Sequence, residues 1–312
     1  MTHLAIIGCG RVGRITAYTL LSERIVEELS VVDIKPSLAK AFTEELKHSA
    51  ASLKFNVKIN YFERSEDLPR ADIIIVTAGY PRIPGVKMSR RDLAAKNGEI
   101  IKSLAEILPK NSGNARYLIV TNPVDAMATL FQKVSGEKFV VSSGTHMDTL
   151  RFKSKLSHEL GVPVSSLDGY VGGEHGPSSV ILWSTVKVNG VNLDDYLREV
   201  GGELNRSEVE GYVREVAKFI IDNTGETEFG PASAFRDIVK AIALNRNDLF
   251  SISIPMKFES LPEAVHVGVP VRVGWNLGSN LFNRLSEDER EAVESSAKKI
   301  YEVYREVLIK YL

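Results

Sequence analysis

The stretch His3-Leu-Ala-Ile-Ile-Gly-Cys-Gly-Arg-Val-Gly13 decides the fold of this 312-residue chain. An apolar run with the length of a buried strand leads into the pattern G-x-G-x-x-G, and a helical pattern follows. In that pattern Gly8 allows a tight turn, Gly10 lets the backbone approach a pyrophosphate, and Gly13 lets the helix pack closely on the strand. Amides at the start of the helix then hold phosphate oxygens. The stretch therefore predicts a strand, a dinucleotide-binding loop and a helix.

An acidic residue stands where such a loop needs one. Asp33 ends the next predicted strand, 20 residues beyond Gly13, where a carboxylate can bond the ribose hydroxyls of an adenosine. Because a carboxylate repels a 2′-phosphate, Asp33 favours NAD over NADP, although Lys35 would soften this discrimination. The alternative for Asp33 is an ordinary acid at a strand end or turn. We expect Arg11 and Val12, inside the glycine loop, to belong to the cofactor site as well.

Strand-like and helix-like segments alternate over the first half of the chain, which favours a parallel, doubly wound Rossmann sheet. The predicted strands cover residues 3–7, 29–34, 57–61, 72–77, 117–121 and 138–141, and the predicted helices cover residues 11–21, 37–51, 89–108 and 124–134. The second half predicts helices at 148–160, 206–223 and 231–244, a hairpin-like pair at 167–171 and 180–188, strands at 250–256 and 265–273, and a long helix from residue 287. We therefore predict an α/β fold with a Rossmann domain over residues 1–144, followed by an α+β catalytic domain over residues 145–312.

The composition argues against several classes of partner. With 44% hydrophobic residues, 25% charged residues and a formal net charge of −1, the chain gives no hint of nucleic-acid or membrane-surface binding. No apolar run approaches the ~20 residues of a membrane helix, and the chain enters its first strand without a signal segment. Cys9 is the single cysteine, which fits a reducing compartment. We expect a cytoplasmic protein.

Candidate catalytic residues lie in the second half. His175 stands in Gly172-Gly-Glu-His-Gly-Pro177, between two predicted strands, and a histidine on such a loop is a candidate general base near neutral pH. Asp148 and Arg151 are three residues apart and share a helix face. The ordinary alternatives are a loop histidine bonded to backbone and a surface ion pair. Asn122 stands before a proline at a strand end, where its side chain can donate and accept or cap the next helix.

A cationic stretch follows the predicted strand at residues 72–77. It reads Tyr80-Pro-Arg-Ile-Pro-Gly-Val-Lys-Met-Ser-Arg-Arg-Asp92, and its cations are Arg82, Lys87, Arg90 and Arg91, with Gly85 available as a hinge. In an open α/β sheet, ligands bind beyond the carboxyl ends of the strands. Two separated arginines there predict a small dicarboxylate as substrate.

Together these motifs resemble the family of lactate and malate dehydrogenases. The stretches that carry the resemblance, in the family's order, are GCGRVG, VVDI, VTAGYPR, MSRRDLAAKN, TNPVDA, SSGTHMDTLRF and GGEHGPSS. They spread from residue 4 to about residue 180, and a weaker match, TEFGPA and then HVGVP, reaches through the second half. One such motif would be weak evidence, whereas the ordered set is highly specific.

The resemblance implies a role for each candidate. His175 would accept the proton of the substrate's C2 hydroxyl, while Asp148 would bond the other imidazole nitrogen and stabilise the imidazolium. Arg151 would hold the C1 carboxylate with two parallel bonds, which a lysine cannot supply. Arg90 would polarise the reacting C–O group, and Asn122 would bond that oxygen and the cofactor side. The other residues implied to line the NAD are Thr77, Ala78, Gly79, Asn97 and Val120.

Arg82 bears on the choice of substrate. In the family, an arginine at the matching position goes with malate and a glutamine with lactate. An unpaired arginine in a closed, dry site costs roughly several kcal/mol, and the C4 carboxylate of malate would pair it where the methyl of lactate would not. We therefore predict an NAD-dependent malate dehydrogenase that interconverts L-malate and oxaloacetate. The alternatives are an L-lactate or other 2-hydroxyacid dehydrogenase, and an Arg82 that is only an exposed loop residue.

Some points stay open in the sequence. Arg90 stands eight positions after Arg82, a longer spacing than is typical of the family, so Arg91 competes with it for the catalytic role. Pro177 replaces the family's common aspartate. The chain starts at its first strand, without the amino-terminal arm of some lactate dehydrogenases, and we expect a homodimer or a homotetramer.

Two rival classes share the nucleotide-binding domain. A protein that senses NAD without catalysis would not need the catalytic set headed by His175. A metal-dependent NAD glycosidase would need a metal site, and the sequence shows no convincing Cys/His cluster, because Cys9 lies inside the glycine loop.

Overall fold

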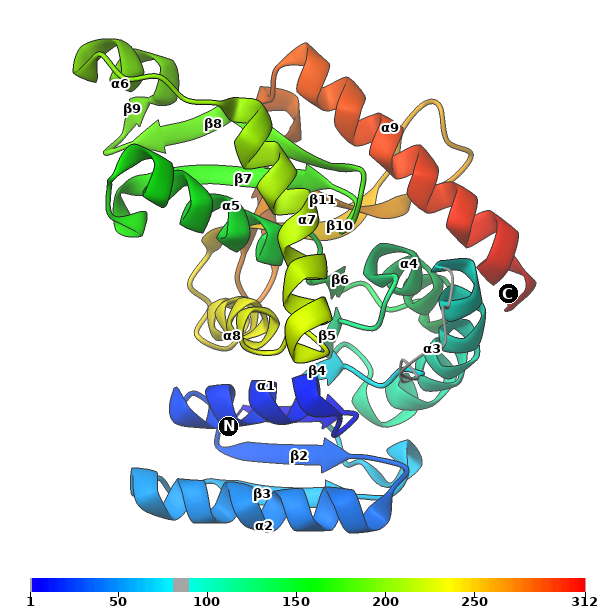
Figure 1. The fold of residues 1–312 in the computed structure, drawn as a ribbon. Helices are drawn as coiled ribbons and strands as arrows, with labels where there is room; N and C mark the ends of the chain where they lie inside the picture. Colours follow the sequence, from blue (N-terminus) through cyan, green and yellow to red (C-terminus); the bar gives the residue numbers. More distant parts are fainter. Residues whose placement is uncertain (1, 81–89, 312) are drawn as a thin grey trace.

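Six parallel strands form the first half of the sheet, in the order β3-β2-β1-β4-β5-β6 (Figure 1). The computed structural model describes residues 2–80 and 90–311. The strands are β1 (His3–Ile7), β2 (Glu28–Val32), β3 (Lys58–Phe62), β4 (Ile73–Val76), β5 (Arg116–Ile119) and β6 (Val140–Ser142), and the helices are α1 (Arg11–Ser22), α2 (Pro36–Leu53), α3 (Arg90–Ser112) and α4 (Val124–Ser135). Every residue of β1 and β4 is buried, as is typical of parallel strands covered by helices on both faces.

The second half of the chain extends this sheet with antiparallel strands. Its strands are β7 (Leu167–Gly173), β8 (Ser179–Val188), β9 (Val191–Asn192), β10 (Asp248–Met256), β11 (Val265–Val273) and β12 (Leu277–Asn280), and its helices are α5 (His146–Leu160), α6 (Leu193–Val200), α7 (Arg206–Thr224), α8 (Phe229–Ala243) and α9 (Glu287–Val303). The order continues β6-β10-β11-β7-β8-β9, and β12 pairs with β11. The predicted fold class, a Rossmann sheet followed by a mixed α and β region, is confirmed.

The two halves share one hydrogen-bonded sheet. β6 pairs with β10 at Ser142 and Ser253, so the sheet runs without a break from the parallel to the antiparallel part. The predicted boundary at residues 144 and 145 falls between the end of β6 and the start of α5. The division into two domains stays a prediction.

Helices of the second half pack back on the first half. α8 packs against α1, and Lys240 of α8 pairs with Glu23, which caps the carboxyl end of α1, at 2.5 Å. After α9 the chain stays helical from Tyr304 to Tyr311, and the Tyr311 hydroxyl donates to the backbone carbonyl of Ala95 in α3 at 2.7 Å. In Figure 1 the red helix α9 runs down to α3 and α4. These contacts fix the candidate site between elements that are far apart in the sequence.

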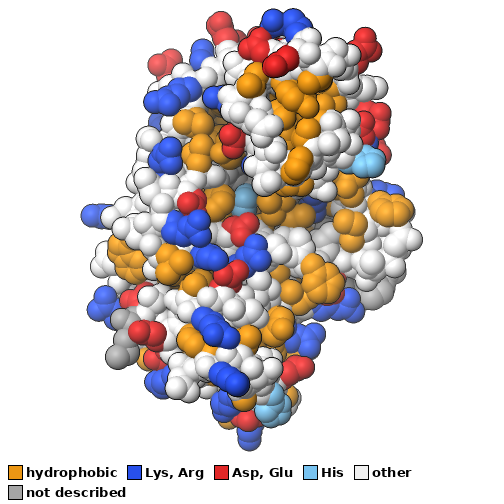
Figure 2. All heavy atoms as spheres, turned by 90° about the vertical axis from the view of Figure 1, so that its left-hand side faces the viewer, with side chains coloured by type: hydrophobic (Ala, Val, Ile, Leu, Met, Phe, Trp, Pro, Cys, Tyr) orange, Lys and Arg blue, Asp and Glu red, His pale blue; other side chains and the backbone are white. Residues whose placement is uncertain are grey.

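The surface mixes charged and hydrophobic side chains. Figure 2 shows hydrophobic patches on one face, with Lys, Arg, Asp and Glu side chains of both signs between them. The exposed large hydrophobic side chains include Tyr18, Phe219, Phe229 and Leu244. Exposed apolar patches are where proteins associate, but the predicted homodimer or homotetramer stays a prediction. Among residues 2–80 and 90–311, no helix has the length and apolarity to cross a membrane.

Candidate active site

A triad of side chains, of which Asp148 and Arg151 are buried and His175 is half-buried, joins the start of α5 to the loop between β7 and β8. Asp148 Oδ2 lies 2.7 Å from His175 Nδ1, and Arg151 Nη1 donates to Asp148 Oδ1 at 2.9 Å. Asp148 is 4% exposed and Arg151 is 9% exposed, so their pair is not a surface ion pair. The predicted helix spacing of Asp148 and Arg151 places them as expected, one turn apart on the same face.

The position of His175 is set through its backbone as well as its ring. The His175 N–H donates to Asp125 Oδ2 at 2.9 Å, and the Glu174 N–H donates to Ser296 Oγ at 2.7 Å. Consecutive amides of the loop are thus anchored to two different helices, α4 and α9. A loop held at both amides gives the imidazole little freedom to leave Asp148.

The charges of the triad favour a protonated imidazole. The Asp148 carboxylate raises the pKa of His175 above its ordinary value, although burial opposes this. Burial alone would raise the pKa of Asp148, but the charge and hydrogen bond of His175, together with Arg151, hold it below its ordinary range. Asp148 therefore stays a carboxylate. Because a carboxylate only accepts hydrogen bonds, Asp148 favours the His175 tautomer that carries its proton on Nδ1. The other ring nitrogen, Nε2, is then the atom that can exchange a proton with a substrate.

Arg151 keeps a donor for an anion. Its Nε is buried and has no hydrogen-bond partner among the residues that the structure describes. A buried donor left unsatisfied costs roughly 1–3 kcal/mol, more for a charged group, so a bound carboxylate next to His175 would relieve a cost that the protein carries without it. The arrangement suits a substrate that has a carboxylate beside the group that exchanges its proton with the histidine.

The glycine loop fits a dinucleotide. Gly8 has a φ of +106°, a conformation that other residues rarely adopt. A Cβ at Gly13 would lie 2.1 Å from the Gly8 carbonyl oxygen, whereas a Cβ at Gly10 would meet no atom within 4 Å. Gly10 is the N-cap of α1 and makes no side-chain capping bond. The open backbone at Gly10 and the uncapped helix start provide the space and the amides that a pyrophosphate needs.

Asp33 lies next to this loop, directly after β2. Its Oδ2 accepts from the Cys9 N–H at 2.7 Å and its Oδ1 from the Lys35 N–H at 2.9 Å. Each carboxylate oxygen has two lone pairs, so both oxygens can accept a further bond from a ribose hydroxyl. Asp33 is thus held in place by the backbone of the glycine loop itself.

The other predicted cofactor residues border the same region. Thr77 Oγ1 donates to the Gly8 carbonyl at 2.9 Å, which ties the end of β4 to the glycine loop. Val12 and Val120 are half-buried. Ala78 lies against Gly8, and Gly79 lies against the Asn97 side chain.

Arg11 is engaged by two carboxylates of the chain. Its guanidinium pairs with Glu226 at 2.9 Å and with Glu228 at 3.1 Å. These glutamates lie between α7 and α8, so the pairs connect the glycine loop with the second half of the chain. No pattern in the sequence predicted these pairs.

Asn97 bridges the ends of two strands. It is 2% exposed, its Oδ1 accepts from the Tyr80 N–H at 2.6 Å, and its Nδ2 donates to the Asn122 carbonyl at 2.6 Å. Its amide therefore holds the segments that follow β4 and β5. Asn122 itself is exposed and stands before a cis peptide bond to Pro123, with α4 beginning at Val124.

Part of the predicted site lies outside the described residues. Arg82, Gly85 and Lys87 fall in residues 81–89, and the side chains of Arg90 and Arg91 are likewise not described. Arg90 is the first residue of α3. The competition between Arg90 and Arg91 for the catalytic role thus stays open.

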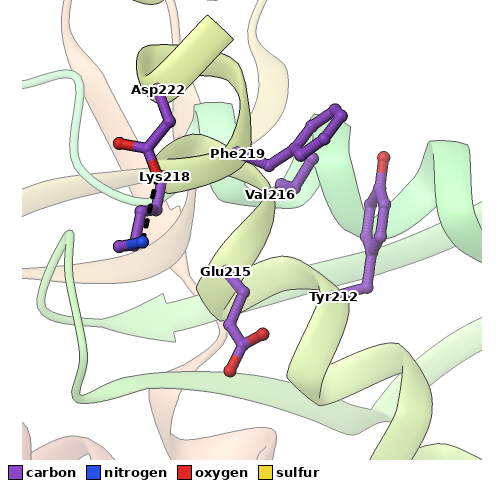
Figure 3. Close-up of a pocket in the computed structure, with 6 residues that line it drawn as sticks. All are labelled: Tyr212, Glu215, Val216, Lys218, Phe219 and Asp222. Atoms are coloured by element: carbon purple, nitrogen blue, oxygen red, sulfur yellow. Dashed lines mark hydrogen bonds and ion pairs between the residues drawn. The ribbon is translucent and has the colours of Figure 1, made fainter.

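Two other features of the structure, a buried histidine and a surface hollow, lie outside the predicted active site. His266 is buried, and burial lowers its pKa to about 4, so it is uncharged at neutral pH. A hollow on α7 is lined by Tyr212, Glu215, Val216, Lys218, Phe219 and Asp222 (Figure 3). It is built from one helix and includes none of the predicted site residues. Within residues 2–80 and 90–311, no group of three or more His, Cys, Asp or Glu side chains could hold a metal ion.

Comparison with known proteins places the chain in a family. Models described as lactate/malate dehydrogenase, NAD binding domain, and lactate/malate dehydrogenase, alpha/beta C-terminal domain, match residues 2–139 and 145–308. A malate dehydrogenase of Sulfurisphaera tokodaii is 40% identical over 99% of this chain and 97% of its own length. A malate dehydrogenase of Sulfolobus acidocaldarius is 37% identical over 98% of this chain and 96% of its own length.

A solved structure gives the same assignment. The minor L-lactate dehydrogenase of Enterococcus mundtii has a TM-score of 0.91 to this chain at 27% identity, covering 99% of both chains. The family's first domain binds NAD, which confirms the predicted cofactor. The chain therefore belongs to the NAD-binding lactate/malate dehydrogenase family.

Proposed function

We propose that the protein is an NAD-dependent L-malate dehydrogenase, which interconverts L-malate and oxaloacetate. The observation that carries the reaction class is the triad: His175 is held by Asp148, and beside them lies the Nε of Arg151, which has no partner among residues 2–80 and 90–311. The preference for malate is supported by Arg82 in the sequence and by the similarity to the malate dehydrogenases of Sulfurisphaera tokodaii and Sulfolobus acidocaldarius, at 40% and 37% identity.

In this proposal, the residues of the chain transfer a proton and bind the two carboxylates and the C2 oxygen of the substrate. When bound, NAD supplies the hydride acceptor, and that chemistry belongs to the cofactor. His175 Nε2 takes the proton of the C2 hydroxyl, and Asp148 stabilises the imidazolium that results. Arg151 holds the C1 carboxylate. Asn122 and Arg90 bond the C2 oxygen, and Arg82 pairs the C4 carboxylate.

Replacing Arg151 by lysine tests its role as the carboxylate anchor. Lysine keeps the positive charge but loses the planar fork, so we expect kcat/KM for the 2-oxo acid to fall about 10- to 100-fold, which corresponds to the loss of one charged hydrogen bond. Steady-state kinetics with NADH measures this. The matched control is Arg214→Lys, at an exposed arginine that pairs with Glu210 one helical turn away. Equal kinetics for the two variants would remove Arg151 from the site.

A second candidate function is L-lactate dehydrogenase, because the Enterococcus mundtii structure that is similar to this chain is one. The test compares oxaloacetate with pyruvate, each with NADH and NADPH, in the unmodified protein. We expect kcat/KM to favour oxaloacetate by about 10⁴-fold, since a site built to pair a polar group rejects an analogue that lacks it. We also expect NADH to be preferred, because the Asp33 carboxylate would bond the ribose hydroxyls and repel a 2′-phosphate. A preference for pyruvate would contradict the malate proposal, and NADH binding without turnover of either acid would contradict the enzyme itself.

A further inference from the structure

Asp125 is a buried acid that lies behind the active site. It is in the first turn of α4 and is 3% exposed. Its Oδ2 accepts the His175 N–H at 2.9 Å, and its Oδ1 accepts from the hydroxyl of Ser142 at 3.1 Å and from that of Ser253. The carboxylate thus gathers donors from the catalytic loop, from β6 and from β10.

A buried carboxylate needs such compensation. Moving a charged group out of water costs roughly several kcal/mol unless hydrogen bonds from the protein replace those from water. The backbone N–H of His175 can only donate, and Ser142 accepts from the Gly144 N–H at 3.1 Å, which leaves its hydroxyl proton for Asp125. The position in the first turn of α4 adds the favourable end of a helix dipole. These donors therefore offset part of the cost of burying an ionised Asp125.

The place of Asp125 in the chain connects it to a second site residue. α4 begins two residues after Asn122, whose side chain would bond the reacting oxygen. By holding the His175 amide, Asp125 joins the catalytic loop to this same short segment. This carboxylate is thus a direct link between the loop of the proton acceptor and the segment of the group that would bond the C2 oxygen.

We propose that Asp125 is a positioning residue for the reaction: its carboxylate fixes the backbone of His175 relative to Asn122, and its negative charge adds to that of Asp148 beside the imidazole. This inference rests on the dehydrogenase reaction proposed above, with either substrate. The residue touches neither the substrate nor the cofactor in this scheme and acts only through His175.

The charges around the imidazole support the electrostatic part. Among the described residues, the charged groups that act on His175 include Asp148 and Arg151 from α5 and Asp125 from α4, and Glu174 of the same loop acts on Asp125. Asp148 contributes most to the raised pKa of His175, and Asp125 contributes in the same direction while Arg151 opposes. Burial raises the pKa of Asp125 itself above its ordinary value, and the hydrogen bonds from Ser253 and from the His175 backbone offset only part of that rise. Removing the Asp125 charge should therefore lower the pKa of His175.

Two variants separate the hydrogen bond from the charge. In Asp125→Asn the charge is lost, while the amide oxygen can still accept the His175 N–H. The two serine hydroxyls, which donate to the carboxylate, would instead have to accept from the amide hydrogens. In Asp125→Ala both the charge and the hydrogen bonds are lost. The matched control is Thr129→Val, one turn along α4, which removes a buried hydroxyl that bonds the Asp125 carbonyl and His266.

The measurements are kcat and KM against pH, and the NMR titration of the His175 imidazole in the protein without cofactor. The His175 signal is identified by its absence in His175→Asn. We expect Asp125→Asn to move the titration and the acidic limb of hydroxy-acid oxidation to lower pH. Asp125→Ala should lower kcat about 10- to 100-fold, because a displacement of about 1 Å can cost that much. NADH affinity should stay unchanged. Thr129→Val should lower the melting temperature alone.

The outcomes are decisive in either direction. A folded Asp125→Ala with the wild-type kcat, or an Asp125→Asn whose His175 titrates as in the wild type, would overturn the proposal and leave Asp125 with a structural role. If Asp125→Ala does not fold, Asp125→Asn decides alone. The dehydrogenase proposal fails by a different result, namely that the unmodified protein turns over neither oxaloacetate nor pyruvate. The NMR titration of His175 can be measured whether or not the protein has this activity.

Discussion

Replacing His175 by asparagine should lower kcat about 10²- to 10⁴-fold, the range that a positioned general acid or base contributes. Asparagine has hydrogen-bonding groups but cannot take up or release a proton near neutral pH, so the C2 hydroxyl loses its acceptor while the loop keeps its amide bond to Asp125. NADH affinity should stay within a few-fold of the wild type, because the glycine loop lies at the other end of the cofactor. Stopped-flow turnover and NADH fluorescence titration measure the two effects.

The control for this variant is His158→Asn, the same exchange at an exposed helix residue, which should leave both quantities unchanged. The pH dependence gives a further check. Oxidation of the hydroxy acid needs the neutral imidazole, so its kcat/KM should rise as the pH passes upward through the raised pKa of His175. Reduction of the oxo acid needs the imidazolium and should fall over the same interval. A His175→Asn protein that retained either pH limb at the wild-type rate would show that another group exchanges the proton.

The sequence predicted those parts of the molecule that depend on neighbours along the chain. The glycine pattern specifies a turn between one strand and one helix, and close approach at Gly13 leaves no room for another residue. The spacing of Asp148 and Arg151 follows from helix geometry alone. The alternation of strands and helices predicted the parallel sheet for the same reason, since each unit is local.

Contacts between distant segments could not be predicted in this way. Asp125 and His175 are 50 residues apart and Asp125 and Ser253 are 128 apart, and no local pattern pairs them. An aspartate in the first turn of a helix is ordinary, so only its burial and its donors distinguish it. The pairs of Arg11 with Glu226 and Glu228 depend likewise on how α8 packs on α1.

Short or mainly exposed elements were missed for a different reason. The eight-residue helix α6 buries only Leu193, so it shows too few apolar positions for a helical period. The exposed strand β9 and the short strand β12 give no alternating pattern long enough to recognise. Pairing with the neighbouring strands β8 and β11 forms them.

Replacing Arg82 by glutamine should reverse or abolish the preference for oxaloacetate. We expect the ratio of kcat/KM for oxaloacetate to that for pyruvate to fall by about 10⁴-fold, the discrimination available to a site built around a polar group. If the proposed function holds, the guanidinium of the unmodified protein would pair the C4 carboxylate and would be left unpaired beside the methyl of pyruvate, at a cost of roughly several kcal/mol. Glutamine carries no charge, so the methyl group becomes acceptable and the second carboxylate loses its partner. Initial rates with both acids and NADH give the ratio.

The matched control is Lys87→Gln, which removes one positive charge from the same stretch of sequence. Arg82 and Lys87 would attract a dicarboxylate equally through long-range charge, and salt screens that attraction. A direct pair with the C4 carboxylate in a closed site is screened much less. The ratio should therefore change in Arg82→Gln alone and should do so at low and high salt. If the kcat/KM ratio changed equally in both variants, and less at high salt, Arg82 would be a solvated loop arginine. A preference for malate would then have to come from another residue.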